Sequence, residues 1–175
     1  MNTTVWGPGA WLFLESLCFN YPEHPNDSDK ARYYNFLGDL MPNILCCRYC
    51  RISTVQFVDE LPIEHYLDNR QALVVWIYLL HDKVNRKLSK QSISFREFVH
   101  RYEKIRAKCS KEKKGCVISS PQKMSSEIDA WADLAYAKYG TRLFLLSKVR
   151  NKTKIQLLLL YIICLVLIIF VIVKN

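Results

Sequence analysis

The sequence predicts an all-α protein: a small bundle of four helices plus a short fifth, then a further amphipathic helix and one C-terminal transmembrane helix. Three observations support this prediction. Apolar residues recur at helical spacing in successive segments of residues 1–107, and no segment there alternates as a strand would. Every residue from 155 to 173 except Gln156 is apolar or aromatic. At roughly 1.5 Å per residue, such a helix could cross a bilayer core of about 30 Å.

The first two helices follow from the breaks in the apolar pattern. Pro8 suits the first position of a helix, so we expect the first helix to begin there. Tyr21-Pro22 ends it. Ser28 or Asp29 can then cap a second helix over Lys30–Leu40, which Met41-Pro42 is expected to end.

Three more helices complete the predicted bundle. A helix-compatible run covers Arg51–Leu61, and Leu61-Pro62 closes it. The longest helix is expected to start at Asp68 or Asn69 and to run to about Leu88. Ser94 can cap a short last helix that extends through Tyr102. Residues 1–107 are therefore predicted to form one domain.

After residue 107 the composition changes. Residues 108–124 are polar and contain Cys109 and Cys116, which indicates a linker. Residues 125–150 are predicted to form a juxtamembrane amphipathic helix, with one apolar face made of Ile128, Trp131, Leu134 and Ala135. The transmembrane helix is assigned to residues 155–173.

The apolar run predicts a single-pass tail anchor. No signal-peptide pattern is recognised in the first residues, and basic residues at 148, 150, 152 and 154 lie on the body side of the run. The positive-inside rule then predicts that the body faces the cytoplasm. The net charge of +9 raises the question of nucleic acid. No nucleic-acid motif accompanies it, so we predict no nucleic-acid partner.

A C-x-x-C pair, Cys47 and Cys50, marks the chemistry of the chain. At the start of a helix, such a pair favours a thiolate because the helix N-terminus is partly positive. Arg48 and Arg51 are expected to lower the cysteine pKa further. Two thiols one turn apart can also close a disulfide. By itself the pair is weak evidence, because roughly a third of such pairs are redox-active and the rest are metal sites or chance spacing.

Several motifs in order strengthen the redox interpretation. Trp6-Gly7-Pro8-x-x-Trp11 is followed by Tyr21-Pro22, then by the C-x-x-C, then by Trp76-x4-His81-Asp82-x-Val84-Asn85-Arg86-Lys87-Leu88-x-Lys90. Together they resemble the Erv/ALR family of FAD-linked sulfhydryl oxidases, over roughly Thr3 to Tyr102. The resemblance implies that the helical bundle holds FAD.

The resemblance also implies which residues hold the cofactor. These are Trp6, Gly7, Pro8, Trp11, Trp76, His81, Asp82, Val84, Asn85, Lys87, Leu88, Lys90, Arg101 and Tyr102. Within this set, Lys87, Lys90 and Arg101 are expected to neutralise the FAD diphosphate. Without the resemblance, Trp11 and Trp76 would be interpreted as core residues, His81 as a buried structural histidine, and the lysines as solvated surface.

The chain departs from the family pattern at several positions. Cys46 stands where the family has proline, and Glu15 stands where it often has histidine, which puts that cofactor contact in doubt. The common His-Asn pair reads His81-Asp82 here. Cellular members carry a structural disulfide at the positions of Tyr78 and Phe95, so packing must replace it. Viral members often lack this disulfide, which together with the anchor favours a viral origin and a virion or host membrane.

The implied reaction transfers two electrons from a dithiol to oxygen, giving a disulfide and hydrogen peroxide. A substrate thiolate is expected to attack Cys47, and Cys50 then passes electrons to FAD. The expected partners are a dithiol protein substrate or a thioredoxin-like relay protein, and a homodimer is a further expectation. Cys109 and Cys116 are a shuttle disulfide, a structural disulfide or two free thiols; the sequence leaves these open.

Two other classes of function remain as alternatives at this point. A zinc module could use Cys46, Cys47, Cys50, His81 and the later cysteine pair, although C-x6-C is a poor zinc knuckle. A non-catalytic membrane adaptor would need only the helical body as a docking surface. Zinc does not explain Trp6-Gly7-Pro8 or the late basic segment, so we predict no metal site; the adaptor alternative stays open.

Overall fold

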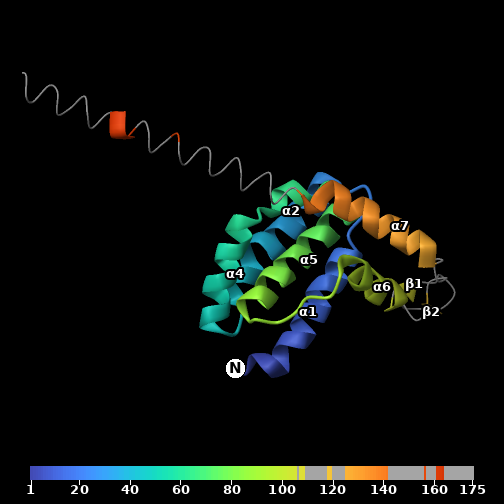
Figure 1. Cartoon of the computed structure of the whole chain (residues 1–175), viewed down its shortest axis with the longest axis horizontal. Coiled ribbons are helices and arrows are strands. Elements are labelled where there is room, and N and C mark those ends of the chain that lie inside the picture. The colour runs from blue at the N-terminus through green and yellow to red at the C-terminus, as the bar shows by residue number, and fades with distance from the viewer. Residues whose placement is uncertain (106, 109–117, 120–124, 142–155, 157–160, 164–175) are drawn as a thin grey trace, which may run out of the picture. The chain divides into compact units, whose positions relative to one another are not determined.

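The computed structural model describes residues 1–105, 107–108, 118–119, 125–141, 156 and 161–163. It has two compact units, Met1–Gly140 and Thr141–Asn175. Helices dominate the first unit, which confirms the all-α prediction (Figure 1). In the described residues, the strands are β1 (Ala107–Lys108) and β2 (Ile118–Ser119), an antiparallel pair that the sequence did not predict.

Helix α1 spans Thr3–Phe19 and begins earlier than predicted. The Asn2 side chain caps it by accepting the Thr4 N–H at 3.0 Å. Pro8 therefore lies inside the helix, and the prediction that Pro8 starts it was wrong. A proline in this position removes one helical hydrogen bond, and an effective cap six residues earlier offsets part of that cost.

The second predicted helix is a continuous helical segment of three parts. α2 (Asp27–Tyr33) is capped by Asn26, not by Ser28 or Asp29, and passes into the π-helix η1 (Tyr34–Leu40) and then α3 (Met41–Ile44). Met41-Pro42 therefore does not end the helix as predicted. The Met41 N–H donates to the Phe36 carbonyl, five residues back. The π-helical turn lies directly before Pro42, which has no backbone N–H to donate. The widened turn accommodates this proline, and the helix continues past it.

Helix α5 (Arg70–Lys87) is the centre of the unit, and its predicted start and end are confirmed. Asn69 caps it by accepting the Ala72 N–H at 3.0 Å. It contacts α1, α4 (Arg48–Glu60) and α6 (Phe95–Ile105), and Figure 1 shows it between α4 and α6. The helix α4 begins three residues before the predicted Arg51. The short 3-10 helix η2 (Ile63–Tyr66) links α4 to α5.

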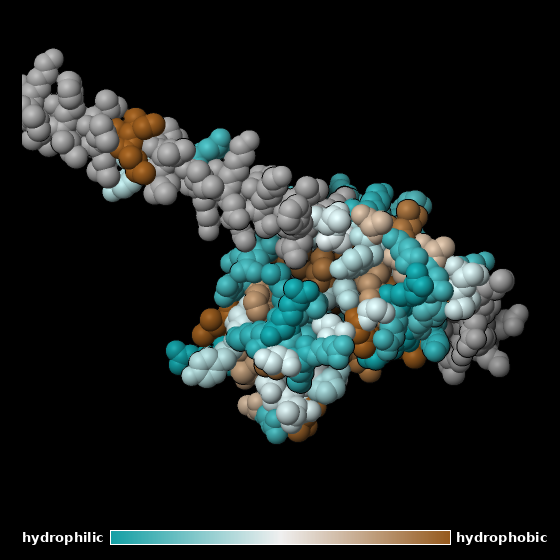
Figure 2. Space-filling view, in the orientation of Figure 1, coloured by the Kyte–Doolittle hydropathy of each residue, from teal (hydrophilic) through white to brown (hydrophobic). Residues whose placement is uncertain are grey.

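The core lies along α5 and is largely aliphatic and aromatic. Trp76 and Leu80 are fully buried, together with Leu37 of η1 and Leu61. Helix η1 and helix η2 approach closely at Gly38, since a Cβ added there would lie 2.8 Å from Ile63 Cγ2. The outer face shown in Figure 2 is mostly hydrophilic, with apolar side chains in small groups.

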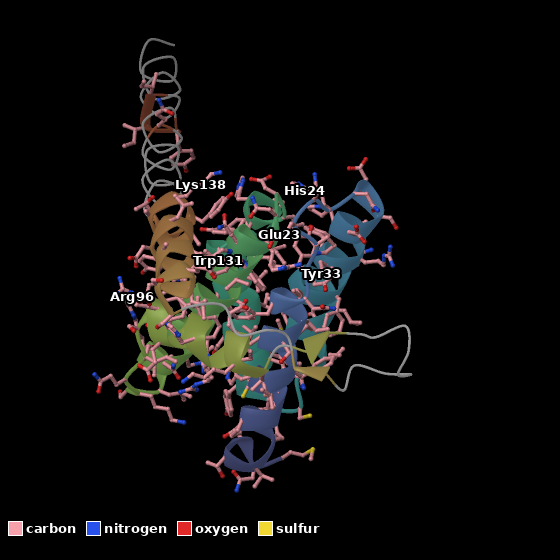
Figure 3. All side chains as sticks on the ribbon, turned by 90° about the vertical axis from the view of Figure 1, so that its right-hand side faces the viewer. Glu23, His24, Tyr33, Arg96, Trp131 and Lys138 are labelled. Carbon is pink, nitrogen blue, oxygen red and sulfur yellow. The ribbon has the colours of Figure 1, made fainter. Side chains whose placement is uncertain are left out.

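Residues 125–140 of the predicted juxtamembrane helix belong to the first unit, and residues 142–150 lie outside the described residues. α7 (Ser125–Ala135) and the π-helix η3 (Tyr136–Gly140) pack on α6 and α5. The buried face consists of Ile128, Ala132, Ala135 and Tyr139, whereas Leu134, predicted on this face, is 62% exposed. Arg96 of α6 lies at the edge facing α7 (Figure 3), where it pairs with Asp133 at 2.6 Å. The compact unit thus extends to Gly140, past the predicted boundary at residue 107.

Tyr78 and Phe95, the positions where the resemblance implied packing in place of a disulfide, are in contact. The rings of Tyr78 and Phe95 meet edge to face with centroids 5.1 Å apart. The Tyr78 hydroxyl also donates to the Ile93 carbonyl at 2.9 Å. Phe98 and Tyr136 contact the same rings, so this cluster joins α5, α6 and η3.

The predicted membrane span lies almost wholly outside the described residues. Of that stretch, residues 156 and 161–163 are described, and they are helical. A search of the described part of the chain finds no helix with the length and apolarity that a bilayer crossing requires. Cys109 and Cys116 also lie outside the described residues.

Candidate redox and cofactor site

The C-x-x-C pair forms the N-terminus of α4. Cys47 is the N-cap residue, and its Sγ accepts the Cys50 N–H at 3.3 Å. The Cys47 carbonyl accepts the Arg51 N–H at 3.0 Å, which begins the helix. All four cysteines described here, Cys18 included, are free thiols, and Cys46 is exposed. The predicted arrangement, two thiols at the mouth of a helix, is therefore present.

The two thiols differ in their ionisation. Hydrogen bonds from the Cys50 thiol and from its backbone N–H lower the pKa of Cys47. Burial, followed by the hydrogen bond and charge of Cys47, raises the pKa of Cys50 to about 11 from an ordinary 9.0. The cation that lowers the pKa of Cys50 is Lys87, on α5. Arg51 instead donates to the Leu45 carbonyl at 2.5 Å.

A buried carboxylate organises the second half of the site. Glu15 of α1 is 4% exposed. Its Oε1 lies 2.6 Å from His81 Nδ1, and its Oε2 accepts the Tyr102 hydroxyl. His81 in turn stacks on Trp11, with ring centroids 3.9 Å apart and planes 6° from parallel. Three of the predicted cofactor residues are thus joined through Glu15, which was not among them.

A cavity of about 170 Å³ opens beside this cluster. Its lining includes four of the predicted cofactor residues: His81, Asp82, Asn85 and Arg101. It also includes residues that sequence reasoning missed: Glu15, Tyr78, Gln91, Ser92, Ile93 and Phe98. The signal for Glu15 was weak: a charged residue interrupts the buried face of α1 four residues after Trp11, but its partners lie far away in the sequence.

Other predicted cofactor residues lie elsewhere. Trp76 is fully buried and donates its indole N–H to the Leu61 carbonyl at 2.8 Å, which supports a core role. Lys87 contacts Ser53 of α4, beside the cysteines. Leu88 and Lys90 are exposed after the end of α5, and Val84 is half-buried.

The residues present fit part of a dinucleotide cofactor. His81, Asn85, Gln91 and Ser92 offer hydrogen-bonding groups, and Arg101 offers a cation for phosphate. On α1, the buried indole N–H of Trp6 has no hydrogen-bond partner among the described residues. Buried donors are normally satisfied, so this atom indicates a missing acceptor. The cavity is smaller than ligand pockets of roughly 300–1,000 Å³, so it accommodates only part of such a ligand.

Metal ligation has little support from the described part of the chain. There, no group of three or more His, Cys, Asp or Glu side chains is placed to hold a metal ion. The zinc alternative would also need Cys109 and Cys116, whose positions the structure does not describe.

Comparisons with known proteins agree with this geometry. The sequence profile described as the Erv1 / Alr family matches residues 8–103. A probable FAD-linked sulfhydryl oxidase of Acanthamoeba polyphaga mimivirus is 30% identical over 105 residues, covering 59% of this chain and 73% of that protein. The FAD-linked sulfhydryl oxidase of African swine fever virus (isolate Pig/Kenya/KEN-50/1950) is 26% identical over 98 residues, covering 56% and 80%.

A solved structure shows the same fold. The FAD-binding domain of Erv1 from Saccharomyces cerevisiae superposes with a TM-score of 0.55 at 26% identity. The match covers 58% of this chain and 94% of that domain.

Proposed function

This chain belongs to the Erv1/Alr family and is an FAD-linked thiol oxidase, and we propose that Cys47 is the sulfur that dithiol substrates attack. The observation that supports this assignment is the position of the pair. Cys47 caps α4 at its N-terminus, where partial positive charge favours a thiolate. Cys50 lies one turn further into the helix, and burial is the main cause of its raised pKa.

Opening of the disulfide is an exchange between three sulfurs. The substrate thiolate forms a bond to Cys47 Sγ, the Cys47–Cys50 bond breaks, and its electron pair stays on Cys50 Sγ. A second substrate thiolate then releases Cys47, so the substrate leaves as a disulfide. Bound FAD supplies the two-electron acceptor that delivers these electrons to oxygen, giving hydrogen peroxide.

Residues around the cavity hold the cofactor in this proposal. Arg101 binds a phosphate group, and Asn85 and His81 supply hydrogen bonds. Asn85 is positioned by its own bond to Ser92 Oγ at 3.2 Å. Glu15 accepts from His81 Nδ1 and so leaves the other ring nitrogen, Nε2, for the ligand.

Trapping of mixed disulfides tests which sulfur is attacked. With oxidised glutathione, Cys50→Ser should accumulate a stable adduct at Cys47, because Cys50 cannot displace it. Cys47→Ser should accumulate much less of the glutathione adduct at Cys50. Peptide mass spectrometry locates the adduct, and a larger yield at Cys50 would reverse the assignment.

The proposed partners are a substrate and a second copy of this chain. The substrate is a dithiol protein or a thioredoxin-like relay protein. A homodimer would cover apolar side chains of α1 and η1 that are about half exposed: Leu12 at 52%, Phe13 at 56% and Leu40 at 49%. Phe13→Asp should then give a monomer in sedimentation experiments. An unchanged mass, or a monomeric parent protein, would exclude this surface.

Residues 155–173 are proposed to anchor the enzyme in a membrane, with the catalytic unit in the cytoplasm. The apolar run and the basic residues on its body side support this topology. The viral relatives support a viral member, and the proposal adds that it acts at a virion or host membrane. Asn26-Asp27-Ser28 is a glycosylation acceptor sequence. Glycosidase-sensitive glycan on Asn26 in eukaryotic cells would place the catalytic unit in the lumen and contradict the proposal.

A further inference from the structure

The proposed order of attack places a demand on Cys50. Both thiols are half-buried, and attack on Cys47 makes Cys50 the leaving group. A thiol with a high pKa leaves slowly, and burial raises the pKa of Cys50 to about 11. Fast exchange through Cys47 therefore needs a positive charge that stabilises Cys50 as it departs.

Two lysines of α5 reach across to α4, and they are engaged differently. Lys83 Nζ forms an ion pair with Glu60 Oε2 at 2.7 Å. Lys87, one turn further on, donates to Ser53 Oγ. In the part of the chain that the structure describes, Lys87 has no carboxylate partner, so its charge is not neutralised nearby.

Ser53 fixes the ammonium of Lys87 on the cysteine side of α4. It is 8% exposed and lies three residues after Cys50, so both side chains share one face of the helix. The Ser53 hydroxyl donates its own proton to the Tyr49 carbonyl at 2.8 Å. Only its lone pairs remain, and an ammonium is a suitable donor for them.

We propose that Lys87 is a positioning residue for disulfide exchange: its ammonium, held by Ser53, stabilises the Cys50 thiolate that departs when a substrate attacks Cys47. This inference rests on the proposed order of attack. In the step, one thiolate enters and one leaves, the substrate–Cys47 bond forms as the Cys47–Cys50 bond breaks, and no external redox partner is needed. Lys87 was expected to neutralise the FAD diphosphate; its contact with Ser53 supports a different use.

The charged groups that act on Cys50 come from two elements. Cys47 lies on α4 and raises the pKa of Cys50, whereas Lys87 lies on α5 and lowers it. A neutral side chain of similar length at position 87 should therefore raise the pKa of Cys50. At pH 8, far below that pKa, such a rise lowers the thiolate fraction of Cys50 and its alkylation rate by the same factor.

The test uses the reduced, FAD-loaded full chain with iodoacetamide at pH 8, followed by peptide mass spectrometry of Cys50. Lys87→Met should slow Cys50 alkylation about tenfold, and Lys87→Arg should restore it to within about twofold. Ser53→Ala should give an intermediate loss, because the charge remains but its anchor is gone. Lys83→Met is the matched control on the same pair of helices and should leave the rate unchanged.

A wild-type rate in Lys87→Met, or an equal loss in Lys83→Met, would overturn the inference. Flavin content and Tm of each variant are measured alongside; if Lys87→Met does not fold, Lys87→Arg and Ser53→Ala carry the same test. The trapping experiment with oxidised glutathione is independent of position 87. If Cys50→Ser traps the glutathione adduct at Cys47 and Lys87→Met alkylates at the wild-type rate, only this inference fails.

Discussion

Replacement of Glu15 should destabilise the catalytic unit more than any exposed charge does. The carboxylate is 4% exposed and receives hydrogen bonds from His81 and Tyr102. Each buried donor left without an acceptor costs about 1–3 kcal/mol, and breaking a buried charged pair costs about 3–5 kcal/mol. We therefore expect Glu15→Ala to lower the free energy of unfolding by about 3–5 kcal/mol.

Thermal and urea unfolding of the apoprotein measure this loss. At roughly 3–5 °C per kcal/mol for a unit of this size, Tm should fall by about 10–20 °C. Glu15→Gln keeps the size of the side chain and one acceptor oxygen, so it should lose about 1–3 kcal/mol. Because Gln cannot serve both donors equally well, FAD affinity should also fall.

Glu23→Ala is the matched control. Glu23 pairs with Arg70 at 2.9 Å, but its side chain is 47% exposed (Figure 3). Exposed ion pairs contribute at most about 1 kcal/mol, so Tm should change by a few degrees or less. A Glu15→Ala protein within about 0.5 kcal/mol of wild type would show that this carboxylate does not organise the site.

Two other predictions rest on the structure, and a third rests on the sequence. Ser89 has a φ of 53° after the end of α5, where the Lys90 N–H donates to the Asn85 carbonyl. Ser89→Gly should therefore raise the free energy of unfolding by about 0.5–1 kcal/mol in urea unfolding. A lower free energy of unfolding would contradict this prediction. Burial raises the pKa of Tyr21 and of Tyr78 to about 12 from 10.0, so the folded state keeps protons that the unfolded state loses. The stability that these tyrosines contribute should be complete below pH 10 and should fall between pH 10 and 12. Tyr78→Phe should reduce that fall, and a flat pH profile of stability would refute the prediction. If Cys109 and Cys116 form the shuttle, changing both to Ser should spare oxidation of a small dithiol and slow oxidation of a folded protein about tenfold. A lower Tm with both activities intact would mean that the pair is a structural disulfide.

The fold was largely predictable because its signals are local. Asn69 and Ser94 are side-chain caps directly before apolar helical repeats, and they mark the starts of α5 and α6. Pro8 and Pro42 misled the prediction, because proline is a strong local signal that a cap or a π-turn elsewhere can override. The packing of α7 on α6 depends on contacts distant in sequence, which periodicity does not reveal.

The site was predictable in its redox half and less so in its electrostatics. Cys47 and Cys50 were identified by their spacing and by the resemblance of the flanking motifs. Glu15 does not, because its partners His81 and Tyr102 are 66 and 87 residues away. Lys87 belongs to a basic cluster whose members look alike in sequence, and only the packing of α5 on α4 singles it out.

Oxygen consumption with a small dithiol, measured on wild type and Cys50→Ser, tests the central claim most directly. Both proteins should purify with yellow, bound FAD, because Cys50 is not expected to hold the cofactor. Wild type should consume oxygen and release hydrogen peroxide, whereas Cys50→Ser should show no turnover, since electrons can no longer pass through the Cys47–Cys50 disulfide. Normal oxygen consumption by flavin-loaded Cys50→Ser would contradict the account.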